Sequence, residues 1–187
     1  MPASLPGTLL VTSPALNVRP RPVESLPTQS AVYCELVRTE LLKRGLKSPS
    51  VTLVSVTRTD LDSDGTAEVI VEASHFRSQD SSTFAPPPNA EAGDYSLLLL
   101  RWVRNGKPQT TVLAQDVFTK TLTQKQLEDG GGQVSSRFGL AGVADLNADG
   151  RMELVVQDVY YEGEGAVVLE WSPGAGVKER LNEGCVA

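Results

Sequence analysis

Short apolar runs separated by polar turns make up most of the chain after residue 50. Runs such as EVIV (68–71) and ELVV (153–156) have the length and the β-branched content of strands rather than helices. Asn105-Gly106 after one such run is a strong signal for a type I′ hairpin turn. We therefore predict two β units, residues 51–114 and 138–182, each a four-stranded antiparallel meander.

One earlier segment, residues 28–45, has the spacing of a helix. Its apolar stripe consists of Val32, Leu36, Val37, Leu41 and Leu42. Thr28 can cap the start, and Gly45 suits the residue after the last turn. Residues 1–27 carry six prolines, so we expect an extended arm there. The helix is expected to cover an edge or an open face of one domain that spans residues 28–187.

The two β units resemble each other. A shift of 85 residues places DLDSDGTAEVIV (60–71) on DLNADGRMELVV (145–156). Trp102 matches Trp171 at a shift of 69, which indicates an insertion of 16 residues within residues 77–93. Two units cannot close a propeller, so we expect a mainly β sandwich or barrel with approximate two-fold symmetry, plus the N-terminal helix (α+β). The two tryptophans are expected in its core.

The repeated segments are acidic loops that can hold cations. Counted from the first Asp of each loop, positions 1, 3, 5 and 9 carry side-chain oxygens: Asp60, Asp62, Asp64 and Glu68 in the first loop, and Asp145, Asn147, Asp149 and Glu153 in the second. Position 7, Thr66 or Arg151, would offer its backbone carbonyl. Hard oxygen ligands at alternating positions predict two Ca²⁺ sites.

Two other loop structures are also rich in Asp, Asn and Gly. An EF-hand needs a bidentate Glu at position 12, where this chain has Val71 and Val156, so the loops are not EF-hands. Asx-rich turns without an ion are the remaining alternative, because Asp, Asn and Gly favour turns in any case.

The second loop also resembles a known family. FGLAGVADLNADGRMELVV (138–156) looks like an FG-GAP repeat, the calcium-loop repeat of integrin α-subunit propellers, and like the related VCBS repeats of bacterial surface proteins. Phe138-Gly139 stands seven residues before Asp145, as in that motif, whereas the first loop lacks Phe-Gly. The resemblance implies that the second loop binds Ca²⁺ and that the first does the same.

Charge and hydropathy narrow the partners. The net charge is −6 and the pI about 4.9, so nucleic acid and anionic membranes are unfavourable partners. No apolar run reaches the roughly 18 residues of a membrane span, so we expect no membrane insertion. The first residues, MPASLPGTLLVTSP, do not form an intact signal peptide. We expect an exported protein (periplasmic, extracellular or at the cell surface) from which a signal peptide has been removed, with a cytosolic protein as the alternative.

Few residues suggest catalysis. His75 is the single histidine, and a Cys34–His75 nucleophile pair has no supporting motif. Export would allow a disulfide between Cys34 and Cys185 that ties the C-terminal tail to the helix. We expect a calcium-stabilised, non-catalytic module that binds a protein or carbohydrate, with the 77–93 insertion as a recognition element that a short turn can replace. The alternative is a hydrolase, or an accessory domain of one, that acts on a polymer.

Overall fold

The computed structural model describes residues 19–79 and 84–186 of the 187-residue chain, so most of the predicted arm lies outside the described residues. The protein is mainly β, as predicted. The elements, in chain order, are β1 (Arg19–Pro20), β2 (Glu24–Ser25), α1 (Ala31–Lys43), β3 (Leu53–Thr59), β4 (Glu68–His75), β5 (Tyr95–Arg104), β6 (Lys107–Val117), α2 (Gln124–Glu128), β7 (Arg137–Asp145), β8 (Glu153–Tyr160), β9 (Gly163–Ser172) and β10 (Gly176–Val186).

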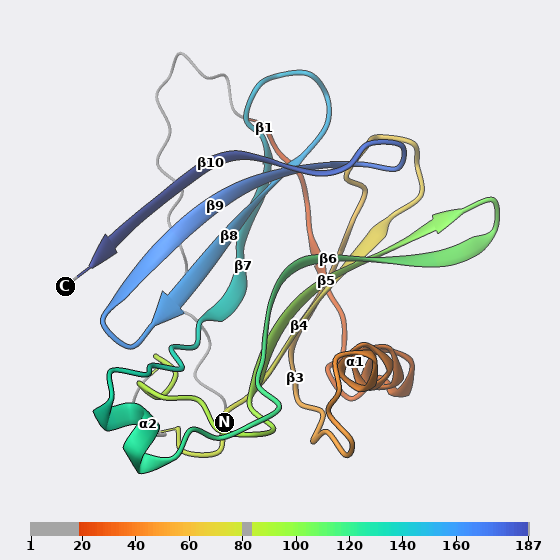
Figure 1. Ribbon diagram of the computed structural model, residues 1–187. Helices are drawn as coiled ribbons and strands as arrows, with labels where there is room; N and C mark the ends of the chain where they lie inside the picture. Colours follow the sequence, from red (N-terminus) through yellow and green to blue (C-terminus); the bar gives the residue numbers. More distant parts are fainter. Residues whose placement is uncertain (1–18, 80–83, 187) are drawn as a thin grey trace.

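The strands form two antiparallel sheets (Figure 1). The first sheet has the order β2-β3-β4-β5-β6 and the second has the order β1-β7-β8-β9-β10. Each therefore contains one predicted four-stranded meander and gains one two-residue strand from the N-terminal segment. Asn105 and Gly106 have φ of 53° and 72°, which confirms the predicted turn between β5 and β6.

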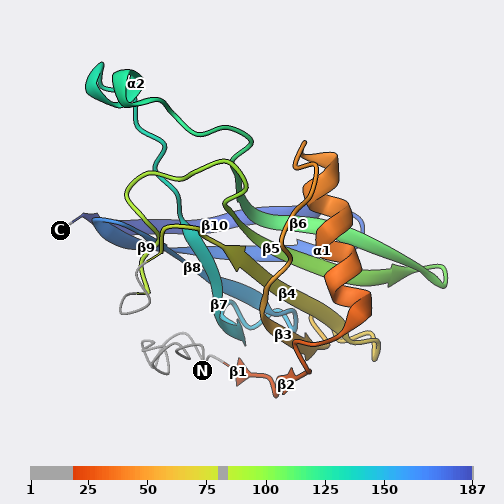
Figure 2. The same ribbon diagram turned by 90° about the horizontal axis from the view of Figure 1, so that it is seen from below.

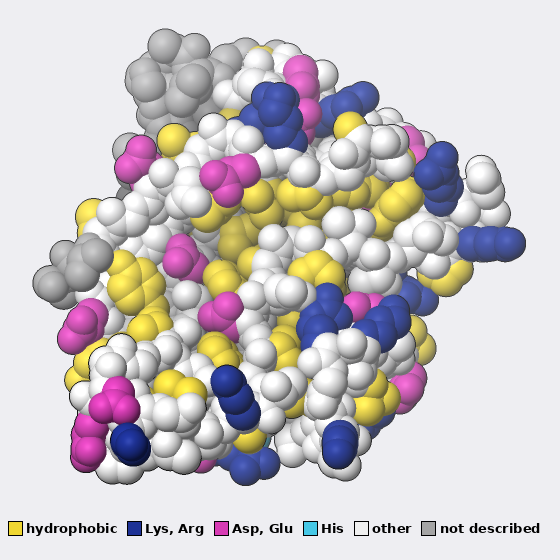
Figure 3. All heavy atoms as spheres, viewed as in Figure 1, with side chains coloured by type: hydrophobic (Ala, Val, Ile, Leu, Met, Phe, Trp, Pro, Cys, Tyr) yellow, Lys and Arg dark blue, Asp and Glu magenta, His cyan; other side chains and the backbone are white. Residues whose placement is uncertain are grey.

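Helix α1 and the two sheets make three layers (Figures 1 and 2). Val37 and Leu41 of α1 are fully buried against Val71 and Leu99 of the first sheet, so the helix covers one sheet face as expected. A second core fills the space between the sheets, centred on residues such as Ile70. Figure 3 shows hydrophobic side chains gathered in a hollowed band between the two sheets.

The ends of α1 differ in part from the prediction. The helix begins after Ser30 rather than Thr28, and Ser30 makes no side-chain capping hydrogen bond. Val32 and Leu42 are 62% and 47% exposed, so the predicted apolar stripe was too wide. Gly45 has φ of 94° and ends the helix as predicted, because this backbone conformation suits glycine.

The packing of the sheets corrects the expected two-fold symmetry. The strand registers pair Ile70 with Leu100 in the first sheet and Val155 with Val168 in the second, so Val155 is the repeat equivalent of Ile70. Ile70 faces the core between the sheets, whereas Val155 lies between two residues that do so and therefore points to the outer face. Equivalent faces of the two units therefore do not meet. The face of the first sheet that carries Ile70 packs against the face of the second sheet opposite to Val155, an arrangement called face-to-back stacking.

The same registers correct the alignment of the tryptophans. Both lie in the core between the sheets as predicted, with ring centroids 5.2 Å apart in an edge-to-face arrangement. However, β5 and β9 correspond at a shift of 68 residues, which makes Glu170 the equivalent of Trp102 and lengthens the insertion by one residue. A one-residue offset moves a side chain to the other face of a strand, so the two tryptophans lie on non-equivalent faces of their units. Face-to-back stacking brings both of these faces to the core between the sheets.

The start of β7 is held by side chains of the first sheet. Its N–H groups on the edge away from β8 would lack strand partners. Side chains of the first sheet accept these hydrogen bonds instead. Asp116 accepts the N–H of Ser136, just before β7, at 2.7 Å; Ser96 accepts the Phe138 N–H at 2.9 Å; and Glu72 accepts the Leu140 N–H at 2.7 Å. Buried backbone N–H groups are costly when unpaired, so these contacts fix how the two sheets dock.

The predicted disulfide is not formed. Cys34 and Cys185 are both free thiols, the first half-buried on α1 and the second exposed at the end of β10. They are far apart because α1 packs on the first sheet, whereas β10 is the edge of the second.

Across the described residues, we find no helix with both the length and the hydropathy of a membrane span.

Candidate metal centre

The two acidic loops, residues 60–68 and 145–153, share one backbone conformation. Position 4 is in the left-handed region in both, with φ of 65° at Ser63 and 63° at Ala148. Position 6 is also left-handed, with φ of 85° at Gly65 and 89° at Gly150, which explains the glycine there. The sequence repeat is therefore also a structural repeat.

Hydrogen bonds inside the loops follow the same pattern. The carboxylate at position 1 accepts the N–H of position 6: Asp60 from Gly65 at 3.2 Å, and Asp145 from Gly150 at 3.0 Å. The carboxylate at position 9 closes each loop onto position 2: Glu68 accepts from Leu61 at 2.8 Å, and Glu153 from Leu146 at 2.7 Å. In each loop, the carboxylate oxygens of positions 1 and 9 thus point toward backbone N–H groups of the same loop.

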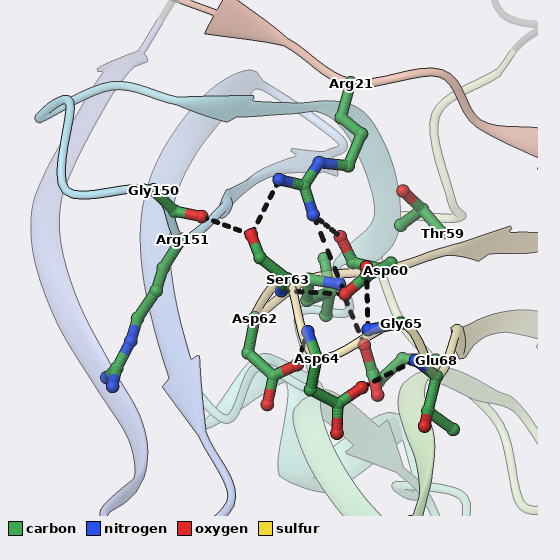
Figure 4. A network of polar contacts seen from close by, with 12 residues as sticks. Arg21, Thr59, Asp60, Asp62, Ser63, Asp64, Gly65, Glu68, Gly150 and Arg151 are labelled. Atoms are coloured by element: carbon green, nitrogen blue, oxygen red, sulfur yellow. Dashed lines mark hydrogen bonds and ion pairs between the residues drawn. The ribbon is translucent and has the colours of Figure 1, made fainter.

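Three carboxylates of the first loop come together (Figure 4). Oxygen atoms of Asp60, Asp62 and Glu68 all lie within 4.8 Å of one another. Asp64 is outside this group, and its Oδ1 accepts the N–H of Thr66 at 2.6 Å. Three of the four side chains predicted to bind the cation are therefore gathered in one place.

Glu68 is the most perturbed group of the first loop. Its residue is only 3% exposed. Burial raises its pKa to about 7, and the nearby carboxylates of Asp62, Asp64 and Asp60 add to the rise, whereas the Leu61 N–H lowers it. The loop holds more negative charge than its own hydrogen bonds neutralise.

Arg21 is a residue of this site that the sequence did not reveal. It lies between β1 and β2, and its guanidinium donates to the Asp60 carbonyl at 2.6 Å and to the Ser63 hydroxyl at 2.8 Å. The guanidinium is 3.6 Å from Asp60 Oδ1, so it supplies part of the missing positive charge (Figure 4). No sequence signal links a lone arginine in the N-terminal arm to a loop about forty residues away.

The second loop gathers a different set. Oxygen atoms of Asp149, Glu153 and Glu170 lie within 4.8 Å of one another, and Asp145 is outside this group. Glu170 is on β9, directly opposite Glu153 in the strand register. Arg180 on β10 forms an ion pair with Glu170. The sequence did not identify Glu170, because it comes from another strand and reaches the loop only through the pairing of β8 with β9.

Electrostatics in the second loop resemble those in the first. Glu153 is 2% exposed, and its pKa is raised, first by burial and then by the charges of Asp149 and Asp145. The Asn147 amide donates to Asp149 at 3.2 Å and to Glu153 at 3.0 Å. Asn147 therefore contacts two of the acidic side chains through its amide NH2 group.

The residues at position 7 contribute backbone contacts. The Arg151 N–H donates to Asp149 Oδ1 at 2.9 Å, as the Thr66 N–H does to Asp64. The Arg151 side chain points away from the carboxylates of the first loop (Figure 4). Binding of a cation by the position 7 carbonyls stays a prediction.

The two loops touch each other, which the sequence did not predict. The Ser63 hydroxyl donates to the Gly150 carbonyl at 2.6 Å, and the Met152 N–H donates to the Leu61 carbonyl at 2.8 Å. Face-to-back stacking places the loops side by side at one end of the sandwich.

The chemistry of the site is that of hard oxygen donors. Carboxylate, amide and carbonyl oxygens suit Ca²⁺ or Mg²⁺, and His75 lies at the other end of β4 from the first loop. Comparisons of the chain with protein-family models, with curated proteins and with solved structures found no match.

Proposed function

We propose that the protein is a calcium-stabilised, non-catalytic binding module of an exported or cell-surface protein, with one Ca²⁺ in each acidic loop. One observation carries the proposal. Each of two structurally equivalent loops contributes to a group of three carboxylates within 4.8 Å of one another, and Glu170 of β9 completes the second group. The FG-GAP and VCBS resemblance of the second loop points the same way.

A bound cation would remove an unfavourable arrangement of charge. Like charges at such distances repel, and the raised pKa values of Glu68 and Glu153 reflect burial and this repulsion. Turns without an ion would account for the hydrogen bonds of the loops, including those that Glu68 and Glu153 accept from position 2. They give no reason to gather further carboxylates beside the buried glutamate. A divalent cation provides that reason.

The ligand sets follow from the contacts. In the first loop, Asp60, Asp62 and Glu68 would hold Ca²⁺, with Asp64 and the Thr66 carbonyl as further donors. In the second, the ligands would come from Asp149, Glu153, Glu170, Asn147 and Asp145, with the Arg151 carbonyl. Each set is within the range of six to eight oxygens that Ca²⁺ takes, once water is included.

The proposed location outside the cytosol rests on the resemblance of the second loop to repeats of surface proteins. Asp64 and Asp149 are exposed, so water can complete the coordination of each ion. Calcium is abundant outside cells, where both sites would fill. The partner would then be a protein or a carbohydrate that meets the module there.

Calorimetry on chelator-treated protein tests the proposal. We expect two calcium sites in the native chain and one in each of the variants Glu68→Gln and Glu153→Gln, since glutamine keeps the hydrogen bond to the loop N–H but not the charge. The second site should be tighter, because only the second loop is preceded by the Phe-Gly of the FG-GAP motif. Calcium at a hundredfold excess over Kd should stabilise the fold by about 2.7 kcal/mol for each site.

The matched control is Glu179→Gln, which removes one exposed carboxylate of β10 outside the loops and should keep both sites. Absence of calcium-dependent heat together with an unchanged melting temperature in the native chain would refute the proposal. Turnover of a polysaccharide or peptide polymer that is lost in a carboxylate variant would favour the hydrolase instead.

A further inference from the structure

A pocket of about 300 Å³ lies at the end of β4 that is remote from the first acidic loop. Five parts of the chain line it: residues 45–50 after α1, His75 at the end of β4, Arg77, residues 92–93, and Thr119. Figure 2 shows the connection after α1 and the segments around residues 93 and 119 at the same end of the molecule. Arg77 and residues 92–93 are the two ends of the 77–93 insertion, so the insertion starts and finishes at this pocket.

The lining of this pocket is basic in an acidic protein. Lys47, His75 and Arg77 line it, and no Asp or Glu does, although the net charge of the chain is −6. Within the described residues, neither Lys47 nor Arg77 forms an ion pair. By contrast, Lys43 and Arg44 at the end of α1 both pair with Glu40. Lys47 and Arg77 therefore bring positive charge to the pocket without an ion-pair partner in the part of the chain that the structure describes.

The position of Arg77 is set by its surroundings. Its backbone N–H donates to the buried Asp94 carboxylate at 2.9 Å, which anchors the main chain after β4. Its guanidinium lies against Gly93, where a Cβ would come within 3.2 Å of Nη2. Gly93 also has φ of 99°, which suits glycine. The backbone at the end of the insertion thus leaves room for the guanidinium in the pocket wall.

Neutral donors complete the lining. Ser48, Ser50 and Thr119, which carry hydroxyl groups, are among the lining residues. Two carbonyls near the end of α1 are already occupied, since Leu42 accepts the Gly45 N–H and Leu41 accepts the Leu46 N–H. The pocket therefore offers many donors and a positive field.

We propose that this pocket binds a ligand through a multiply charged oxyanion, a phosphate or sulfate group. The two permanent cations, Lys47 and Arg77, match a dianion, whereas a carboxylate would leave one of them uncompensated. The guanidinium fork and the hydroxyl donors suit a group with three or four oxygens. This site is separate from the acidic loops and does not depend on calcium.

NMR titration offers a direct test, because His75 is the only histidine of the chain and its ring signals need no assignment. Separate samples receive inorganic phosphate, sulfate or acetate at constant pH and ionic strength. We expect a saturable shift of the His75 ring with phosphate or sulfate, and at least tenfold weaker binding of acetate. Whichever of the two oxyanions binds more tightly identifies the group.

Two variants of exposed side chains test the assignment of the cations. Lys47→Gln and Arg77→Gln should each weaken oxyanion binding about tenfold or more, since a charge-assisted hydrogen bond is lost. Lys107→Gln on the β5–β6 hairpin is the matched control and should bind as the native chain does. The proposal is wrong if neither oxyanion gives a saturable shift, if acetate binds equally well, or if both variants retain native affinity.

Discussion

Among single residues, Glu72 on β4 joins the two sheets through a buried carboxylate. It is 5% exposed, accepts the Leu140 N–H of β7 and is hydrogen-bonded to the Ser55 side chain. Burial raises its pKa above the ordinary value of 4.5, and these two hydrogen bonds only partly oppose the rise. The folded protein therefore holds a proton on Glu72 at pH values where the unfolded chain has lost it.

This shift makes stability depend on pH. Because the folded pKa is raised, the contribution of Glu72 is fully present below about pH 4.5 and is lost as the pH rises through the folded pKa. In Glu72→Gln the group is neutral at every pH and still accepts the Leu140 N–H. Urea unfolding in chelator should show a smaller fall in unfolding free energy above pH 4.5 for this variant than for the native chain.

Glu179→Gln is the control for that series, and its pH profile should follow the native one. Parallel profiles for Glu72→Gln and the native chain would mean that Glu72 is ionised in the fold at neutral pH. The opposite slope, with the variant losing more stability as the pH rises, would also contradict the prediction.

Residues of the candidate site were predictable only where they are close in sequence. The alternating Asp and Asn residues of each loop, with glycine at position 6, predicted the loops and most of the carboxylates that come together. Glu170 and Arg21 come from other strands and segments, so only the three-dimensional pairing reveals them. Asp64 and Asp145 fit the sequence pattern but lie outside the groups that converge.

Among elements, the pair of acidic loops is coupled through one side chain. The Ser63 hydroxyl accepts from Arg21 and donates to Gly150, so it links the N-terminal segment, the first loop and the second loop. Ala148 occupies the equivalent position of the second loop with nearly the same φ. Alanine is therefore compatible with the backbone at position 4.

Ser63→Ala should lower the unfolding free energy by about 0.5–1.5 kcal/mol, the net value of a hydrogen bond. Chemical denaturation in chelator measures this change without a calcium contribution. The reciprocal variant Ala148→Ser adds a hydroxyl at the same backbone position and should change stability by less than about 0.5 kcal/mol. Equal effects of the two substitutions would show that the contact between the loops does not stabilise the fold.

Strands and turns were predictable because their signals are local. Apolar runs of strand length and the Asn105-Gly106 turn predicted both meanders, and Gly45 predicted the end of α1. The relative register of β5 and β9 was off by one residue, since Trp102 and Trp171 match by residue type but not by face. The start of α1 was also misplaced, because Ser30 and Thr28 are both acceptable capping residues.

At the scale of the whole molecule, the two units are supported unequally. The first sheet is buried on both faces, by α1 on one side and by the second sheet on the other. Among residues 19–79 and 84–186, the second sheet shares only the core between the sheets, and Val168 and Leu181 remain partly exposed on its outer face. The start of β7 also relies on acceptors from the first sheet. The second unit therefore depends on the first more than the first depends on the second.

Native-state hydrogen exchange should reveal this difference. We expect amides of β8 and β9 to exchange through an opening that is at least about 1 kcal/mol less costly than the opening that exposes β4 and β5. Low concentrations of denaturant, applied to chelator-treated protein, would separate the two openings. A single opening free energy for all four strands would show instead that the domain unfolds as one unit.

The support that α1 gives the first sheet bears on how the chain folds during synthesis. Helix α1 and β3–β6 precede β7–β10 in the chain, so the first unit, which has its own core between α1 and the first sheet, emerges from the ribosome first. The side chains that cap β7 are in place on that unit before β7 emerges. The newly made second meander then meets a prepared surface with its hydrogen-bond acceptors in position, which shortens the time its edge is open to pairing with other chains.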